Sequence, residues 1–179
     1  MPVPLSEGLR LSYASAPKGE DPILTVELLN VAFPEPLRFV SGLPEGTEGW
    51  QAKLEDDAPE NPGELVTFRV VPFSFSEPGT EKGGATPAQL SIANASSEIS
   101  DVLDLTIGNR SALVVNVRIY TPSERTTRPG NVLRGLRMRR VEATPTEASG
   151  ELTYEDAARQ AFPLLTFGQA DYPALFQGA

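Results

Sequence analysis

The chain has 179 residues with no cysteine and no histidine, and its net charge is −9 at pH 7. Without cysteine it cannot form disulfides, zinc thiolate sites, iron–sulfur clusters or cysteine nucleophiles, and without histidine it lacks the commonest general base. Its 17 Pro and 15 Gly favour one domain of short strands with many turns.

Charge is distributed unevenly along the chain. Residues 1–109 carry 6 Lys/Arg and 17 Asp/Glu, a net −11, whereas residues 110–179 carry 9 Arg and 7 Asp/Glu, a net +2. This division predicts either head-to-tail contacts between identical copies or simply more solvated loops in the front half. The overall acidity argues against nucleic-acid binding, because neutralising phosphates requires clustered cations.

The sequence contains no targeting or membrane-spanning pattern. The start, MPVPLSEGLR, lacks a basic region followed by an apolar one, so it does not resemble a signal peptide. No apolar run reaches the roughly 18–20 residues that span a bilayer. We therefore expect a protein made in the cytoplasm without a membrane segment.

The first predicted elements are an arm and a hairpin. Residues 1–22 are weakly patterned, so we expect an arm, with a short strand at 9–13. Alternating apolar residues predict strands at 23–31 and 37–40, and the prolines between them predict a hairpin over 23–41. The first strand has an apolar and a polar face, formed by Leu24, Val26 and Leu28 and by Thr25 and Glu27.

Residues 42–63 are predicted to form a loop, because Pro and Gly punctuate them. The loop contains the acidic run 55–57, whose spacing does not resemble a calcium loop, so we expect it to be solvated. Trp50, the only tryptophan, begins a brief predicted strand at 50–54.

Two strands joined by a long hairpin loop are predicted next. Residues 65–75 alternate as a strand that Pro72 interrupts, which predicts a bulge or an edge position there. Residues 76–86 form the loop, which we expect to project from the body. Residues 87–121 then predict a strand, a short helix and the clearest strand of the sequence. In this stretch Leu90, Ile92, Val115 and Val117 are expected in the core. Asn116, Arg118 and Tyr120 are expected to point to the opposite, outward side.

The last part of the chain predicts two further strands and a tail. After a turn at 122–130, residues 131–142 alternate as a strand whose phase breaks at 140–141, which predicts a bulge. Another strand is expected at 151–154, after a loop, and residues 162–179 are aromatic and Pro-punctuated without a strong period. In the long strand Leu136 and Met138 are expected to point inward, and Arg137 and Arg139 outward.

Together these elements predict a mainly β protein. The expected architecture is an antiparallel β-sandwich or barrel with one short inserted helix and an extended C-terminal tail. We expect an N-terminal arm at 1–22, a β-rich domain at 23–161 and the tail at 162–179.

The sequence does not predict an enzyme, a cofactor or a metal site. It contains no G-x-S-x-G elbow, no phosphate-cradling glycine loop and no H-E-x-x-H motif. Paired carboxylates could support glycoside hydrolysis, but 24 acidic residues place some pairs at suitable separations by chance. No catalytic, cofactor-binding or metal-binding residue is therefore predicted.

Arginine and aromatic residues are the candidates for protein–protein docking. All nine basic residues after position 82 are Arg, whose planar fork suits pairing with carboxylates at interfaces. The alternative is a solvated strand face paired with local Glu residues. The candidate docking residues are Arg118, Tyr120, Arg134, Arg137, Arg139, Phe162, Phe167, Tyr172 and Phe176.

Several motifs, in their order and spacing, resemble a family of small proteins from bacteriophage and prophage tail modules, the domain of unknown function DUF1833. They are A-x-L-x-I-x-N at 88–94, V-x-V-x-I at 115–119, G-E-L-T-Y-E-D at 150–156 and Y-P-A-L-F at 172–176. The resemblance runs over residues 23–176, and the chain departs from the family in its longer arm and its 42–63 loop.

The resemblance implies a virion protein, a structural subunit of a long-tail tip or baseplate that assembles as a ring around the tail hub. The implied partners are further copies of the chain and the distal-tail, hub and tape-measure proteins, and the implied location is the tail tip of the virion. The alternative is a carbohydrate- or receptor-binding β-sandwich module of the tail tip, with Trp50 and the 42–63 loop making stacking contacts.

Overall fold

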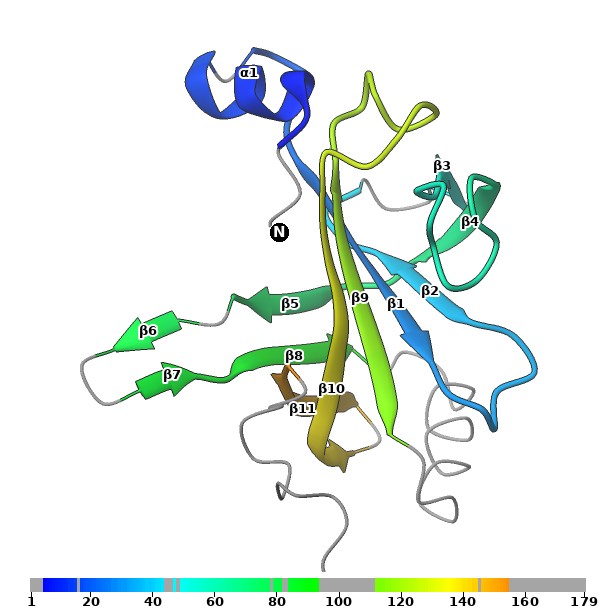
Figure 1. The fold of residues 1–179 in the computed structure, drawn as a ribbon, viewed down its shortest axis with the longest axis vertical. Coiled ribbons are helices and arrows are strands. Elements are labelled where there is room, and N and C mark those ends of the chain that lie inside the picture. Colours follow the sequence, from blue (N-terminus) through cyan, green and yellow to red (C-terminus); the bar gives the residue numbers. More distant parts are fainter. Residues whose placement is uncertain are drawn as a thin grey trace, which may run out of the picture.

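A single sheet of nine strands forms most of the fold (Figure 1). This computed structural model describes residues 5–15, 17–43, 47, 49–77, 79–81, 84–93, 112–144 and 146–154. In spatial order the strands are β3 (Trp50–Lys53), β4 (Leu65–Val70), β2 (Leu37–Val40), β1 (Ile23–Leu29), β9 (Leu113–Tyr120), β10 (Asn131–Ala143), β11 (Glu147–Thr153), β8 (Ala88–Ala93) and β5 (Phe73–Ser76).

The predicted mainly β class is confirmed, although the sheet is mixed rather than wholly antiparallel. β2 and β4 pair in parallel through Phe39 with Arg69 and Val40 with Val70, and the other neighbouring strands pair antiparallel. The predicted 23–41 hairpin is present as β1 and β2. β5 and β8 also pair, and a small hairpin of β6 (Gly79–Glu81) and β7 (Gly84–Thr86) projects from them, as expected for residues 76–86 (Figure 1).

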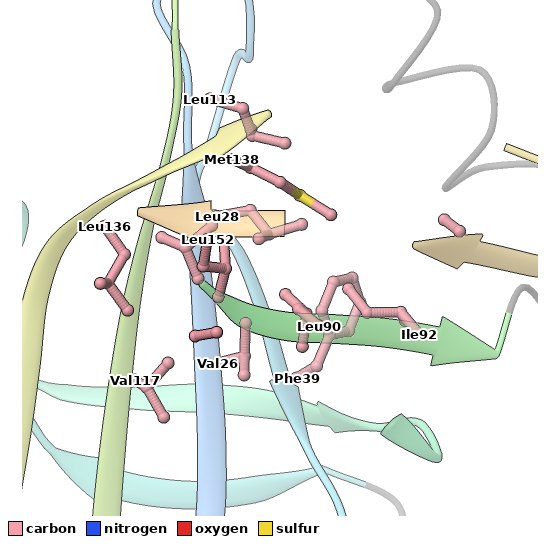
Figure 2. Packing of buried hydrophobic residues seen from close by; sticks show 13 residues of the cluster. Val26, Leu28, Phe39, Leu90, Ile92, Leu113, Val117, Leu136, Met138 and Leu152 are labelled. Carbon is pink, nitrogen blue, oxygen red and sulfur yellow. The ribbon is translucent and has the colours of Figure 1, made fainter. Parts of the chain in front are cut away.

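The main core forms where the sheet curls upon itself. β8 and β5 cross steeply over β1, β9 and β10 in Figure 1, and Figure 2 shows the side chains of β8 meeting those of β1, β9 and β10. Leu90, Ile92, Val115 and Val117 belong to this core, as predicted, and Leu136 and Met138 also point into it. The other buried members are Val26, Leu28, Phe39, Ala88, Leu113, Ala148 and Leu152.

A second apolar cluster lies on the opposite side of β1, β2 and β9. β3, β4 and the residues that follow β3 pack over this side, and Trp50, Phe68 and Tyr120 form the centre of the cluster. The three rings meet edge to face with centroid distances of 5.8 Å (Trp50 to Phe68), 5.4 Å (Trp50 to Tyr120) and 6.4 Å (Phe68 to Tyr120). The sheet therefore has buried residues on both faces of its central strands.

β10 contains two bulges, of which the sequence predicted one. The register shifts between Arg139 and Glu142, where a bulge was expected, and also between Leu133 and Leu136. At the unpredicted bulge Gly135 has a φ of +70°, a conformation that glycine adopts at low cost. The extra residue keeps Leu133 and Leu136 on the same apolar face although they are three positions apart.

The strand predicted at residues 9–13 is wrong, because these residues belong to helix α1 (Glu7–Ser15). Ser6 caps the helix: its Oγ accepts a hydrogen bond from Leu9 N at 3.2 Å. Glu124, in the turn after β9, accepts hydrogen bonds from Ser6 Oγ at 2.5 Å and from Gly8 N at 3.2 Å. These contacts fix the start of the helix on the body of the domain.

Pro72 separates β4 from β5 rather than forming a bulge within one strand, and β5 lies at the edge of the sheet. β11 begins at residue 147, so the loop expected before it is shorter than predicted. The predicted helix between β8 and β9 and the tail at 162–179 lie outside the described residues. In the described ranges, no helix has the length and apolar character required to cross a membrane.

Replacing Phe68 with Ala should lower the free energy of unfolding by about 3–5 kcal/mol, because the ring is fully buried in the second cluster. Leu65→Ala on the same strand is the matched control, since Leu65 is 52% exposed and should lose less than about 1 kcal/mol. Chemical denaturation followed by Trp50 emission and circular dichroism measures both. Equal losses in the two variants would contradict the packing described.

Candidate functional site

Six charged side chains meet between the central strands and the loop that follows β3, and we refer to them as the ion cluster. They are Glu27 on β1, Arg38 on β2, Arg118 on β9, Arg134 on β10, and Glu55 and Asp57 in the loop. Glu27, Arg38 and Arg118 alternate with core residues along their strands, so they occupy the sheet face opposite the main core.

Glu27 is held by side chains on both neighbouring strands. Arg38 and Asn116 lie directly opposite it in the register of β2 and β9. Arg38 Nε donates to Glu27 Oε1 at 2.9 Å, and Asn116 Nδ2 donates to Oε2 at 3.1 Å. Because Glu27 is fully buried, these bonds replace the water that its carboxylate loses on folding.

Arg118 lies at the centre of the cluster and is also fully buried. Its Nε and Nη2 donate to the two carboxylate oxygens of Glu55 at 2.6 and 2.9 Å, and its Nη1 donates to Glu27 Oε2 at 2.9 Å. The double bond to Glu55 is the bidentate geometry for which the guanidinium is suited. Arg118 therefore ties the loop to the sheet.

Arg134 extends the cluster to the surface. Its Nη2 and Nη1 donate to Asp57 Oδ1 and Oδ2 at 2.6 and 2.7 Å, and its Nε lies 3.1 Å from Glu55 Oε1 in an ion pair without hydrogen-bond geometry. The Gly135 bulge supports this arrangement, because Gly135 N donates to Asn116 Oδ1 at 3.0 Å. The side chain of Asp57 is 77% exposed, so this pair forms the outer rim.

The pKa shifts agree with this geometry. Burial acts to lower the pKa of Arg118, but the hydrogen bonds and charges of Glu55 and Glu27 outweigh it and raise that pKa above its ordinary value. The hydrogen bond from Arg134 lowers the pKa of Asp57, and the same bond raises the pKa of Arg134. Burial raises the pKa of Tyr120, whose hydroxyl donates to the Lys53 carbonyl at 2.9 Å. Arg118, Arg134 and Asp57 are therefore charged at neutral pH, and Tyr120 is neutral.

The ion cluster holds the loop after β3 against the sheet, and we refer to it in this role as a clamp. Each of its carboxylates faces at least one guanidinium, so none is placed as an unpaired general base or nucleophile. At the other end of the loop, Arg38 Nη2 donates to Asn61 Oδ1 at 2.8 Å, and Asn61 has a φ of +53°. Within the described ranges, His, Cys, Asp and Glu form no group of three that could hold a metal ion.

The structure corrects the predicted outward orientation of Arg118 and Tyr120. Both side chains are fully buried, because β3, β4 and the following loop cover the sheet face on which the alternation correctly placed them. The expectation of a solvated 55–57 run is likewise wrong for Glu55, which is 9% exposed and bound to Arg118. The signal that the sequence analysis missed is the acidic run itself, which supplies counterions for Arg118 and Arg134.

The other candidate docking residues are not brought together with Arg118 and Tyr120 in one exposed face. Arg134 is partly buried and paired with Asp57, and Arg139 is exposed on β10. Arg137 is half-buried beside it, and docking through either residue stays a prediction. Phe162, Phe167, Tyr172 and Phe176 lie outside the described residues.

Trp50 does not present a ring face for stacking on an external ligand. It is 4% exposed and packs against Phe68 and Tyr120. The predicted stacking role of Trp50 is therefore not supported by its position.

Comparison with known protein families gives one match. A family model described as Domain of unknown function (DUF1833) matches residues 8–167, a range that includes most of α1 and the nine strands of the sheet. No curated protein matches the chain.

Replacing Arg118 with Met should lower the free energy of unfolding by about 3–5 kcal/mol, because two buried carboxylates lose their main partner. Arg139→Met is the matched control, since Arg139 is exposed on the neighbouring strand and should change stability by less than about 0.5 kcal/mol. Denaturation at pH 7 measures both variants. Similar stabilities would show that Arg118 is not the centre of a clamp.

The Asp57 carboxyl should titrate below its ordinary value of 3.8, and Arg134→Gln should raise its midpoint, because the variant removes the hydrogen bond that lowers the pKa. The pKa of Asp57 is lower in the folded chain than in the unfolded chain, so its pair with Arg134 stabilises the fold at pH values above the unfolded pKa. This stabilisation is lost as the pH falls through the folded pKa. Carboxyl chemical shifts followed by NMR measure the midpoint. An Arg137→Gln variant serves as the control and should leave it unchanged.

Proposed function

The chain belongs to the DUF1833 family, and on this premise we propose that it is a non-enzymatic structural subunit of a bacteriophage long-tail tip. Its sequence motifs resemble proteins of phage and prophage tail modules, and that resemblance is what supports a place in a virion. In this role the chain assembles as a ring around the tail hub, next to the distal-tail and tape-measure proteins.

The observation that carries the structural role is the mutual pairing of the charged groups in the ion cluster. The three guanidinium groups and three carboxylates of the ion cluster pair with one another, and the sequence contains neither His nor Cys. Such a site stabilises a scaffold and itself contains no poised base or nucleophile. The clamp also joins the acidic front of the chain to its basic back, so this charge complementarity acts within one copy.

Contacts between copies then require other surfaces. We propose that the aromatic tail at 162–179 and the arginines of β10, Arg137 and Arg139, make them. The alternative, a carbohydrate- or receptor-binding module acting through Trp50, is not favoured, because the Trp50 ring is buried. A sugar site elsewhere on the domain is considered separately below.

Deleting residues 162–179 should prevent incorporation into phage particles while leaving the β domain folded, because the last described strand of the sheet ends at Thr153. A phage or prophage lacking the gene, supplied with either the full-length or the shortened protein, allows the comparison. Infectivity and the protein content of purified particles give the result, and circular dichroism gives the fold. Infectious particles that lack the full-length protein altogether would overturn the proposal.

A further inference from the structure

A groove of about 500 Å³ lies over β5, β8, β11 and the end of β10. Most of its lining residues alternate with members of the main core along their strands, so the groove is on the outer side of this part of the sheet. It is separate from the ion cluster, with which it shares no residue.

The strand register arranges the polar side chains of the groove in two rows across the strands. Ser74 on β5 lies opposite Ser91 on β8, which lies opposite Ser149 on β11, and Ser149 lies opposite Glu142 on β10. The neighbouring row comprises Ser76, Gln89 and Glu151, and it continues on β10 to Arg139, which lies outside the groove lining. At about 4.8 Å between strands, each row is about 14 Å long, which suits a short chain molecule lying across the strands.

Some of these groups are already bonded, and others are not. Arg140 Nη1 donates to Glu151 Oε1 at 2.8 Å, and Ser91 donates to Glu147. By contrast, hydroxyl, amide and carboxylate groups along the groove have no side-chain partner in the described part of the chain. These are the side chains of Ser74, Gln89, Ser149 and Glu142. They offer both donors and acceptors to a bound molecule.

This combination favours one ligand chemistry. The lining carries three carboxylates and one guanidinium, which disfavours phosphorylated, sulfated or uronic ligands. A basic peptide fits less well, because Arg140 lies in the groove and two of the carboxylates already have partners. The methylene stems of Gln89, Glu147 and Arg140 give the groove apolar surface beside its hydroxyl and amide groups, whereas the Phe75 and Leu90 side chains pack into the main core. A sugar ring presents the same mixture of hydroxyl groups and C–H faces.

We propose that this groove binds a neutral oligosaccharide. The free hydroxyl, amide and carboxylate groups exchange hydrogen bonds with sugar hydroxyls, and the methylene stems beside them contact a C–H face. This inference is independent of the structural role proposed above, since a subunit that forms a ring can carry a glycan site or lack one.

The test uses the full-length protein and an array of neutral hexasaccharides of glucose, mannose, galactose and N-acetylglucosamine, with sulfated and uronic hexasaccharides and an oligo-arginine peptide as comparisons. We expect at least one neutral hexasaccharide to bind, and calorimetry to show the affinity falling about tenfold or more in the double variant Gln89→Ala/Ser149→Ala. The matched control is Gln51→Ala, an exposed glutamine on β3 far from the groove in the sheet order, which should retain binding within about twofold.

If the double variant fails to fold, Ser74→Ala and Glu142→Gln, both at exposed positions, replace it. Failure of every neutral hexasaccharide to bind would overturn the proposal. So would a neutral glycan whose affinity the groove variants leave unchanged. Binding of oligo-arginine that depends on Gln89 and Ser149 would assign the groove to a basic peptide instead. None of these outcomes bears on incorporation into virions, so failure here is distinguishable from failure of the structural role.

Discussion

The bidentate pairing of Arg118 with Glu55, and the bond from Arg118 to Glu27, hold together parts of the chain that are far apart in sequence. All three side chains are buried, so each depends on the others to replace lost hydration. β3, β4 and the loop after β3 have few ladder contacts with the rest of the sheet, since β4 meets β2 through only two residue pairs. The ion cluster therefore supplies much of what fixes this unit over the central strands.

The same arrangement explains why the domain has two buried layers. The main core fills the curl between β8 and the central strands (Figure 2), while the Trp50, Phe68 and Tyr120 rings fill the other side. Glu55 directly follows Leu54, which is a buried member of the second cluster. Apolar packing and ion pairing thus both act on the loop after β3. Each of the two interactions keeps water away from the other.

The polar groove and the ion cluster contain similar residue types but differ in whether their polar groups are already paired. In the ion cluster, every charge is paired within the chain, and Glu27 and Arg118 at its centre are fully buried. In the groove, small hydroxyl residues on adjacent strands leave space, and several polar groups retain free bonding capacity. Burial, rather than residue type, separates a structural site from a candidate binding site here.

The sequence by itself determined the nine strands of the main sheet approximately, most of the turns, the 140–141 bulge and the inward residues of the main core, because period-2 alternation and Pro/Gly punctuation are local signals. It also placed Glu27 and Arg118 on the polar face of their strands. It could not determine that this face is buried, because the segments that cover it, β3, β4 and the loop between them, are distant in sequence from β1 and β9. Helix α1, whose cap is completed by Glu124, was missed for a related reason. Only the tertiary structure decided which charges are enclosed and which face solvent, because burial depends on which segments meet in space.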